Sequence, residues 1–241
     1  MVTSRRDKCK VAVVIPAYNE AERVGRVLEA AAAVEGVDEI VVVDDGSTDD
    51  TAEVARSFGA RVIRNERNLG KGGALQAGFR STGADIVCTL DADLVGLTPG
   101  HVERLLSPLF SDSSVEMTVG KFSGGRARTS LAQGLAKSLS GQRAIRRGLI
   151  ERLPDLGEAG FGVETLVTKS ARSLGARIEI VELHGAGQVM KEEKLGVRQG
   201  LAYRMKMYSD IAGHLMKKTP PACDGRRTNR KRPGGPARRS S

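Results

Sequence analysis

The sequence is poor in cysteine and in aromatic residues. Its 241 residues include three cysteines, three tyrosines, five phenylalanines and no tryptophan. Cys9, Cys88 and Cys223 lie far apart and form no CxxC pair, which is the pattern of neither a zinc knuckle nor a disulfide framework. Few aromatic side chains are available to stack on the bases of single-stranded nucleic acid, so we do not expect nucleic acid as a partner.

Long apolar segments are missing as well. No run of residues approaches the roughly 20 apolar residues of a transmembrane helix, and the charged N-terminal stretch MVTSRRDKCK does not have the pattern of a secretory signal. Cys88 lies in an apolar run and is expected to be a small core residue, which fits a reducing compartment. These observations predict a cytoplasmic protein.

The excess of positive charge lies near the C-terminus. The formal net charge is +9, from 38 basic and 29 acidic residues. Nine basic residues and one acidic residue lie between Lys217 and Ser241, which leaves 29 basic and 28 acidic residues in 1–216. We therefore expect 219–241 to be a basic, disordered tail that could attach the protein peripherally to the anionic inner face of a membrane. The rest of the chain is nearly neutral.

Residues 1–218 are expected to form one α/β domain. Hydrophobic residues make up 40% of the sequence and charged residues 28%, as in globular proteins. In the first half, short apolar runs alternate with amphipathic stretches. The expected strands are Val11–Ile15, Glu39–Val43, Arg61–Ile63 and Ile86–Leu90, and the expected helices are Glu20–Val34, 47–59 and Lys71–Ser81. This order predicts a central, mostly parallel twisted sheet flanked by helices.

The second half is less regular. Its expected helices are Pro99–Phe110, Ala127–Leu139, Val163–Leu174 and Leu195–Met216, and its expected strands are Val115–Gly120 and Arg177–Leu183. We divide the domain into a nucleotide-sugar half at about 8–120 and an acceptor half at about 121–218, for reasons that the following motifs provide.

The loop after the first expected strand reads Pro16-Ala17-Tyr18-Asn19-Glu20. Ligands of doubly wound sheets bind at the carboxyl ends of the strands, where Tyr18 could stack on a nucleoside and Glu20 could hydrogen-bond to it. A plain turn with Asn19 as a helix N-cap is the alternative interpretation. A dinucleotide-binding fold would have GxGxxG here, and the motif is absent.

Two further loops follow expected strands or open expected helices. Asp44 and Asp45 are adjacent carboxylates, one of which is expected to face a ligand while the other supports the loop, and Ser47 is expected to cap the next helix. Gly70 and Lys71 belong to the run Asn68–Gly73, whose backbone N–H groups could bind a phosphate. A glycine-rich turn without a ligand is an equally good interpretation.

Asp91-Ala92-Asp93 ends the fourth expected strand. The period of two along a strand would place Asp91 and Asp93 on one face. Two close carboxylates favour a hard divalent cation, Mg or Mn, with ligand phosphates completing its shell. A solvated acidic turn is the alternative. The strongest argument for a site is that all four loops are expected at one edge of the sheet.

The order PAYNE, VVVDDGSTDDT, NLGKGGA and DAD resembles family 2 glycosyltransferases with the GT-A fold. The resemblance covers roughly Val11 to Pro99. It implies a nucleotide-sugar site in which Asp93 binds the metal, Asp91 contacts the ribose or the metal, and Lys71 lies near the diphosphate. The expected nucleotide-sugar-binding residues are Pro16, Ala17, Tyr18, Glu20, Asp44, Asp45, Gly70, Lys71, Asp91 and Ala92.

The second half resembles, more loosely, polyprenyl-phosphate sugar transferases and glucosyl-phosphoglycerate synthases, through the segment 160–164, GFGVE. The resemblance makes Glu164 a candidate acid/base or acceptor-orienting residue, although a carboxylate is also favourable in the first turn of a helix. Val95 departs from the polyprenyl-phosphate enzymes, which often have Gln there. A late metal-binding His in some relatives could correspond to His184, with Gln188 as the alternative.

Two charged clusters remain open. Arg143, Arg146 and Arg147 are expected to form either a surface helix face or a site for an anionic acceptor. The run 191–194, KEEK, is expected to be a solvated helix start or a loop that closes over the donor.

The resemblance implies a metal-dependent enzyme that moves a sugar from a nucleotide-diphosphate sugar to an acceptor. A UDP-sugar is favoured over a GDP-sugar, and the acceptor is expected to be a small phosphorylated compound or a lipid phosphate. A nucleotidyltransferase is an alternative that would have a glycine-rich basic loop where PAYNE stands, and a non-catalytic binder that uses the tail is another. The sequence leaves a homo-oligomer open.

Overall fold

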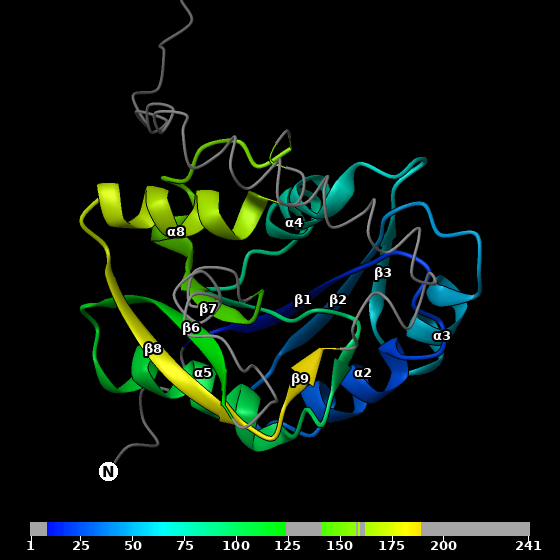
Figure 1. The fold of residues 1–241 in the computed structure, drawn as a ribbon, viewed down its shortest axis with the longest axis horizontal. Helices are drawn as coiled ribbons and strands as arrows, with labels where there is room; N and C mark the ends of the chain where they lie inside the picture. The colour runs from blue at the N-terminus through cyan, green and yellow to red at the C-terminus, as the bar shows by residue number, and fades with distance from the viewer. Residues whose placement is uncertain (1–8, 124–140, 158, 160–161, 189–241) are drawn as a thin grey trace, which may run out of the picture.

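A computed structural model describes residues 9–123, 141–157, 159 and 162–188 (Figure 1). Its strands are β1 (Val11–Ala17), β2 (Glu39–Asp44), β3 (Arg61–Arg64), β4 (Ile86–Thr89), β5 (Leu94–Val95), β6 (Val115–Ser123), β7 (Arg143–Arg146), β8 (Arg177–His184) and β9 (Gly187–Gln188). Its helices are α2 (Val24–Ala32), α3 (Thr51–Ser57), α4 (Gly70–Ser81), α5 (Pro99–Ser111), α7 (Arg147–Ile150) and α8 (Val163–Ser173).

Seven strands form one sheet in the order β3-β2-β1-β4-β7-β6-β8. The strands β3, β2, β1 and β4 are parallel, with Val13 opposite Ile40 on one side and Cys88 on the other. The pair β6 and β8 is also parallel. The predicted α/β fold with a mostly parallel central sheet is therefore confirmed, and the carboxyl ends of β1, β2 and β4 lie at a common edge.

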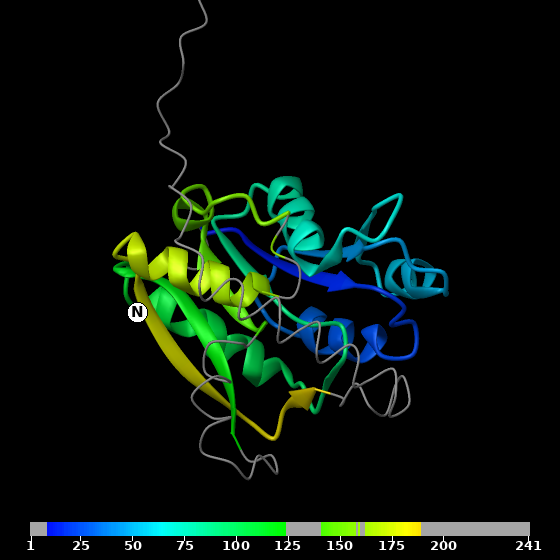
Figure 2. The same cartoon turned by 45° about the horizontal axis from the view of Figure 1, so that its top comes forward.

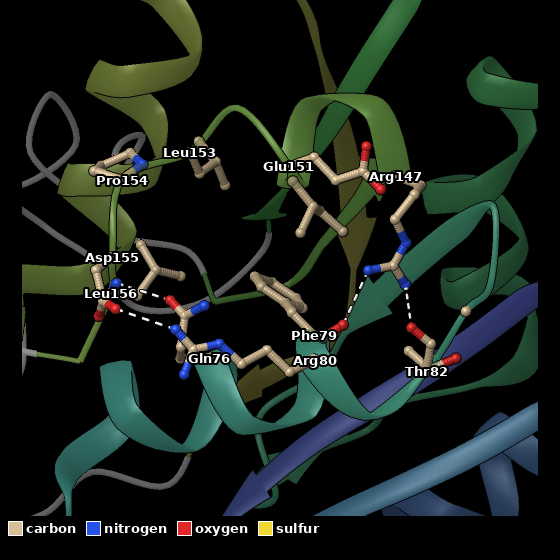
Figure 3. Close-up of a pocket in the computed structure, with 12 residues that line it drawn as sticks. Gln76, Phe79, Arg80, Thr82, Arg147, Glu151, Leu153, Pro154, Asp155 and Leu156 are labelled. Carbon is tan, nitrogen blue, oxygen red and sulfur yellow. Dashed lines mark hydrogen bonds and ion pairs between the residues drawn. The ribbon is translucent and has the colours of Figure 1, made fainter. Parts of the chain in front are cut away.

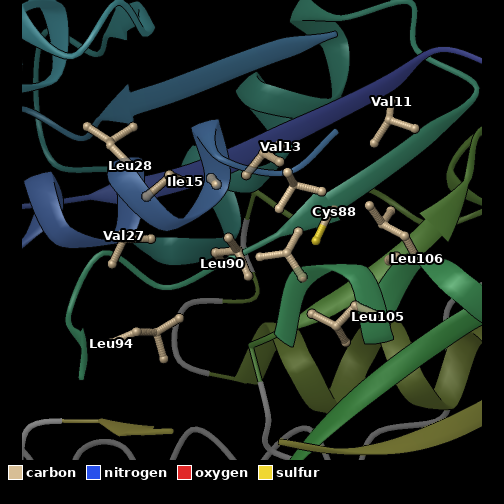
Figure 4. Packing of buried hydrophobic residues seen from close by; sticks show 14 of the residues in the cluster. Val11, Val13, Ile15, Val27, Leu28, Cys88, Leu90, Leu94, Leu105 and Leu106 are labelled. Carbon is tan, nitrogen blue, oxygen red and sulfur yellow. The ribbon is translucent and has the colours of Figure 1, made fainter. Parts of the chain in front are cut away.

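Helices cover both faces of this sheet (Figures 1 and 2). Side chains alternate along β1, so that Val11, Val13 and Ile15 pack with α2 and α5, whereas Val14 packs with α4 and α8. Figure 4 shows the first of these two clusters, in which Cys88 is fully buried. Burial raises the pKa of the Cys88 thiol to about 12, so this residue is a core residue, as expected.

The strand β7 is a feature that the sequence analysis missed. It lies antiparallel between β4 and β6, and its residues 143–146 are not part of a surface helix, so that interpretation of the basic cluster is wrong. Arg146 donates hydrogen bonds to the carbonyl oxygens of Leu109 and Val115. Arg147 likewise donates to backbone carbonyls at the C-terminal end of α4, those of Phe79, Thr82 and Ala84. These two arginines therefore hold the fold together.

The predicted helix cap at Ser47 is wrong, and so is the alternative interpretation of Asn19 as a cap. The helix α2 begins at Val24, and Asn19 has a left-handed φ of 54° with its Oδ1 accepting a hydrogen bond from Thr48 N at 2.9 Å. Ser47 Oγ accepts a hydrogen bond from Asn19 N at 2.9 Å and does not cap α3, which begins at Thr51. These reciprocal hydrogen bonds join the loop after β1 to the loop after β2, and so stiffen the edge where the candidate site lies.

Several expectations fall outside the described residues. These are the helices 127–139 and 195–216, the charged run 191–194 and the basic tail 219–241. Within the described part of the chain, no helix has the length and apolarity needed to cross a membrane.

Candidate active site

A lysine between two carboxylates forms the centre of the candidate site. Lys71 Nζ lies 2.5 Å from Asp91 Oδ1 and 2.5 Å from Glu164 Oε1. Lys71 is in the first turn of α4, Asp91 follows β4, and Glu164 is in the first turn of α8. The fold thus joins the nucleotide-sugar half and the acceptor half of the predicted domain at one ion-paired cluster.

The cluster is largely removed from water. Asp91 is 6% exposed and Glu164 is 8% exposed. Burial by itself would lower the pKa of Lys71, but the charges of Asp91 and Glu164 outweigh it and raise that pKa above its ordinary value. Lys71 is therefore a permanent cation at this site over the whole physiological pH range.

Arg143 is a second buried cation close to the cluster. It is 3% exposed, and its Nη1 donates hydrogen bonds of 3.3 Å to the backbone oxygen of Glu164 and to Thr168 Oγ1. Burial lowers the pKa of its guanidinium, and the nearby charges of Glu164 and Asp91 oppose that effect. Arg143 thereby fixes the first turn of α8, which carries Glu164.

The Asp91-Ala92-Asp93 segment is a turn, since β4 ends at Thr89. The strand-alternation argument for placing both carboxylates on one face is therefore wrong. Asp91 is held by Lys71 at Oδ1 and by Gln142, whose Nε2 donates to Oδ2 at 2.9 Å. Asp93 is half-buried and precedes β5, which pairs with β9 so that Leu94 lies opposite Gln188.

The predicted metal set of Asp91, Asp93 and His184 is not brought together in the described residues. Among them, no three His, Cys, Asp or Glu side chains are placed to hold one metal ion. His184 is exposed, with Nδ1 2.6 Å from Ser123 Oγ and Nε2 3.5 Å from Glu182 Oε2. Gln188, the alternative, lies on β9 beside the strand that follows Asp93, so it is nearer in the fold to the turn.

The adjacent carboxylates of Asp44 and Asp45 make contacts with different parts of the fold. The Asp45 carboxylate accepts hydrogen bonds from Asn65 Nδ2, Leu69 N and Gly70 N at 2.7–3.0 Å, so it supports the turn that opens α4. Asp44 is fully buried, with Oδ1 accepting from Ser47 N at 2.9 Å. Its Oδ2 accepts no hydrogen bond from the described residues and lies 3.4 Å from Arg64 Nε. The role of Asp44 toward a ligand stays a prediction.

The glycines that open α4 have a packing role. Gly70 has a φ of 78°, a conformation that glycine adopts without strain. A Cβ on Gly72 would overlap the backbone oxygen of Leu156. Close packing is thus sufficient to explain the glycine at position 72, without a ligand. Lys71, the preceding residue, therefore lies directly beside a closely packed backbone.

The loop after β1 lies next to the loop after β2, which follows Asp44 and Asp45. Tyr18 is 45% exposed, whereas Ala17 is buried and Pro16 half-buried at the end of β1. Glu20 N donates to Thr51 Oγ1 at 2.8 Å, and the Glu20 carboxylate lies 3.5 Å from Arg23. An exposed ring at the sheet edge is compatible with stacking on a base.

A cavity lies in another part of the described structure. It measures about 490 Å³ and lies between α4, α7 and the segment 153–156. Figure 3 shows Gln76 accepting a hydrogen bond from Leu156, and Arg80 donating one to Asp155, at its edge. The lining residues that α4 contributes begin at Gln76, whereas Lys71 is in the first turn of that helix. This cavity therefore does not contain the carboxylate cluster.

The sequence analysis missed Gln142 and the contact that Arg143 makes with α8. Gln142 directly precedes β7, and Arg143 is its first residue. The four residues of β7 have no apolar alternation that would reveal a strand. The pair Ser140-Gly141 carried no recognised motif either. Only the pairing of β7 with β4, through Arg143 opposite Thr89, brings these side chains to Asp91 and Glu164.

Comparisons with known proteins agree with this geometry. The family model "Glycosyl transferase family 2" matches residues 12–163. Glucosyl-3-phosphoglycerate synthase of Mycolicibacterium smegmatis is 33% identical over 236 residues, covering 84% of this chain and 73% of that protein. Undecaprenyl-phosphate 4-deoxy-4-formamido-L-arabinose transferase of Sodalis glossinidius is 34% identical over 198 residues, covering 73% of this chain and 60% of that protein.

A solved structure is similar over most of the chain. The crystal structure of glucosyl-3-phosphoglycerate synthase from Mycobacterium tuberculosis, in complex with Mn²⁺, uridine diphosphate and phosphoglyceric acid, superposes with a TM-score of 0.73 at 30% identity. The superposition covers 89% of this chain and 80% of that structure. Another structure of the same enzyme holds Mg²⁺ and uridine diphosphate. The matched family model, the relatives and the shared fold show that this chain belongs to glycosyl transferase family 2.

Proposed function

We propose that the protein transfers a hexosyl group from UDP-glucose or a related UDP-sugar to a small phosphorylated acceptor, with Mn²⁺ or Mg²⁺ as cofactor. The observation that carries the proposal is the buried cluster of Lys71, Asp91 and Glu164 at the edge where β1, β2 and β4 end. The chain belongs to a glycosyl transferase family, and solved structures of a similar enzyme are complexes with uridine diphosphate and Mn²⁺ or Mg²⁺.

The donor half of the site would bind the nucleotide sugar. Tyr18 is exposed for stacking on the base, and Lys71 supplies a cation for the diphosphate. The carboxylate of Asp93 is the type of hard oxygen ligand that Mg²⁺ and Mn²⁺ prefer, and phosphate oxygens and water would complete the shell. Asp93 would be the principal protein ligand, as the resemblance to family 2 glycosyltransferases implies. A bound cation would neutralise charge on the leaving diphosphate.

The acceptor half of the site would be organised by Glu164 and Arg143. Glu164 lies in the first turn of α8 and shares Lys71 with Asp91, so it faces the donor half. A hydroxyl acceptor needs a positioned base, and Glu164 is the candidate for that role. An acceptor that attacks through a phosphate oxygen needs none. Val95, which stands where the polyprenyl-phosphate enzymes often have Gln, favours the small phosphorylated acceptor.

Other aspects of the proposal concern the whole chain. This chain covers 73% of one curated relative and 58% of another. We propose a single catalytic domain over residues 1–218 in a cytoplasmic protein. Residues 219–241 would be a basic tail that attaches this protein peripherally to the inner face of the membrane. Sedimentation with anionic and neutral vesicles, before and after removal of 219–241, tests the attachment. A homo-oligomer is compatible with this arrangement.

The products of the reaction test the proposed function. The protein would be incubated with UDP-glucose and Mn²⁺, with either 3-phosphoglycerate or undecaprenyl phosphate as acceptor. We expect release of uridine diphosphate and a glucosylated phosphoglycerate in the mass spectrum. Glucosylated lipid would assign the acceptor to the lipid phosphates instead. Pyrophosphate release would identify a nucleotidyltransferase, and binding without turnover would identify a non-catalytic binder; either result would overturn the proposal.

A further inference from the structure

Gln142 is a buried residue directly before β7, a strand that no sequence motif marks, and its side-chain amide contacts the candidate site. Its side chain is 0% exposed, and Nε2 donates a hydrogen bond of 2.9 Å to Asp91 Oδ2. A buried glutamine is uncommon unless its amide is hydrogen-bonded, so this contact has to compensate part of the loss of water.

The backbone around Gln142 is held on both sides. Thr89 Oγ1 donates to the carbonyl oxygen of Gly141 at 2.7 Å, and Gly120 N donates to the carbonyl oxygen of Gln142 at 2.8 Å. Arg143 then pairs with Thr89 in the ladder between β7 and β4. The amide therefore lies directly before β7, at a position whose backbone is hydrogen-bonded to neighbouring strands.

Asp91 is held at both carboxylate oxygens by groups from different elements. Lys71 of α4 contacts Oδ1 at 2.5 Å, and Gln142 contacts Oδ2. A single cation on a flexible side chain would leave the carboxylate plane able to turn, whereas two donors at opposite oxygens define it. Gly141 completes this arrangement, because a Cβ there would overlap the Asp91 carboxylate and lie 2.6 Å from Lys71 Nζ.

The residue type at position 142 suits this contact. A neutral amide adds a hydrogen bond to Asp91 without changing the net charge of a cluster that already contains Lys71. A carboxylate of the same length at position 142 would repel Asp91. An apolar side chain would fill the volume but could not donate.

We propose that Gln142 is a positioning residue that orients Asp91 for binding of the nucleoside diphosphate part of the donor. The inference rests on the proposed function, in which Asp91 belongs to the donor half of the site. Gln142 acts through Asp91, so its loss affects the donor and not the acceptor.

The test compares Gln142→Met, which keeps the volume and removes the donor, with Gln142→Glu, which replaces the donor by an acceptor. Gln76→Met is the matched control, because Gln76 also makes one hydrogen bond through its side chain, to Leu156 N at 2.9 Å, beside the distant cavity. We expect the KM for UDP-glucose and the Kd for uridine diphosphate with Mn²⁺ to rise about tenfold in both Gln142 variants, as for other residues that orient a ligand-binding group. In the Gln142 variants, the KM for the acceptor should stay at the wild-type value. In Gln76→Met, the KM for UDP-glucose and the Kd for uridine diphosphate should also stay at the wild-type values.

A second comparison separates positioning from a merely structural role. In a variant that already carries Asp91→Asn, Gln142→Met should change the Kd for uridine diphosphate no further. Both substitutions disable the same interaction, the one between Gln142 and the Asp91 carboxylate. If Gln142→Met does not fold, Gln142→Asn, which retains an amide too short to reach, replaces it with the same expected shift.

The outcomes are distinguishable. Wild-type values of donor KM and Kd in folded Gln142 variants would overturn the positioning role, as would additive effects in the double variant. Failure of the wild-type protein to bind any nucleoside diphosphate would overturn the proposed function, and the positioning role with it.

Discussion

The charge of Asp93 is expected to be indispensable, whereas its size is not. Asp93→Asn keeps the shape of the side chain and removes the anionic oxygen that the proposed cation requires. We expect Mn²⁺-dependent transfer to fall about 100-fold or more, because even residues that only support metal ligands cost 10–100-fold when replaced.

Initial rates over a Mn²⁺ titration, together with the circular dichroism spectrum, measure this effect. Asp155→Asn is the control, since Asp155 is an exposed aspartate paired with Arg80 beside the distant cavity. Full activity of Asp93→Asn would rule out the assignment of Asp93 to the metal.

Lys71 is expected to contribute to stability as well as to binding. Lys71→Met leaves the carboxylates of Asp91 and Glu164 buried without their cation, for which a cost of about 3 kcal/mol is typical. Urea denaturation measures the change in the free energy of unfolding. Lys121→Met is the control, because its ion pair with Glu182 is exposed and 3.8 Å long, and we expect it to cost less than about 1 kcal/mol.

The same lysine gives the stability a pH dependence of known sign. The pKa of Lys71 is raised in the folded state, because the two carboxylates outweigh the effect of burial. Its contribution is therefore fully present below the ordinary lysine pKa of about 10.4 and is lost as the pH rises through the higher pKa of the folded state. The difference in unfolding free energy between wild type and Lys71→Met should be constant from pH 7 to about 10 and shrink above that. A difference that grew above pH 10 would contradict the ion-pair assignment.

The packing of α4 connects the site to the rest of the described fold. Gly72 lies against the backbone of Leu156, so Gly72→Ala would force the helix away from the segment that leads to Glu164. We expect a loss of stability of about 1–3 kcal/mol, as for overpacked cores, and lower activity through displacement of Lys71.

Gly83→Ala is the matched control for Gly72→Ala. A Cβ at Gly83 would meet nothing within 4 Å, so this variant should be as stable as wild type or slightly more stable. Thermal unfolding of both variants provides the measurement. Equal melting temperatures would show that α4 and the 153–159 segment adjust to each other without cost.

The elements also show why some predictions from the sequence succeeded and others did not. The strands β1, β2 and β4 are continuous apolar runs, so periodicity alone found them. The strand β7 has the sequence RAIR, and its first and last residues bind backbone oxygens, a use of arginine that composition does not reveal. The predicted cap at Ser47 and the alternative cap at Asn19 were wrong because these side chains contact another loop rather than the nearest helix.

At the scale of the whole molecule, ligand binding is expected to stabilise the fold. Uridine diphosphate would contact loops after β1, β2 and β4 and the start of α4 together, none of which is assembled in the unfolded chain. Uridine diphosphate with Mn²⁺ at about 100 times its Kd should therefore add about 2.7 kcal/mol to the free energy of unfolding.

The melting temperature with and without these ligands tests this expectation. Addition of EDTA should remove most of the shift, because the diphosphate is then bound without its cation. A shift that is insensitive to EDTA would contradict metal-dependent binding of the nucleotide.

The sequence by itself determined the parallel half of the sheet, the identity of the loops at its edge and the family, because these depend on apolar periodicity and on motifs within short stretches. The tertiary structure alone decided that Asp91 and Asp93 lie in a turn, that Glu164 reaches Lys71, and that Gln142 reaches Asp91. The contacts of Gln142 and Glu164 depend on β7 and on α8, whose positions are set by pairing and packing with residues far away in the chain. A contact between distant segments leaves no periodic pattern in either of them.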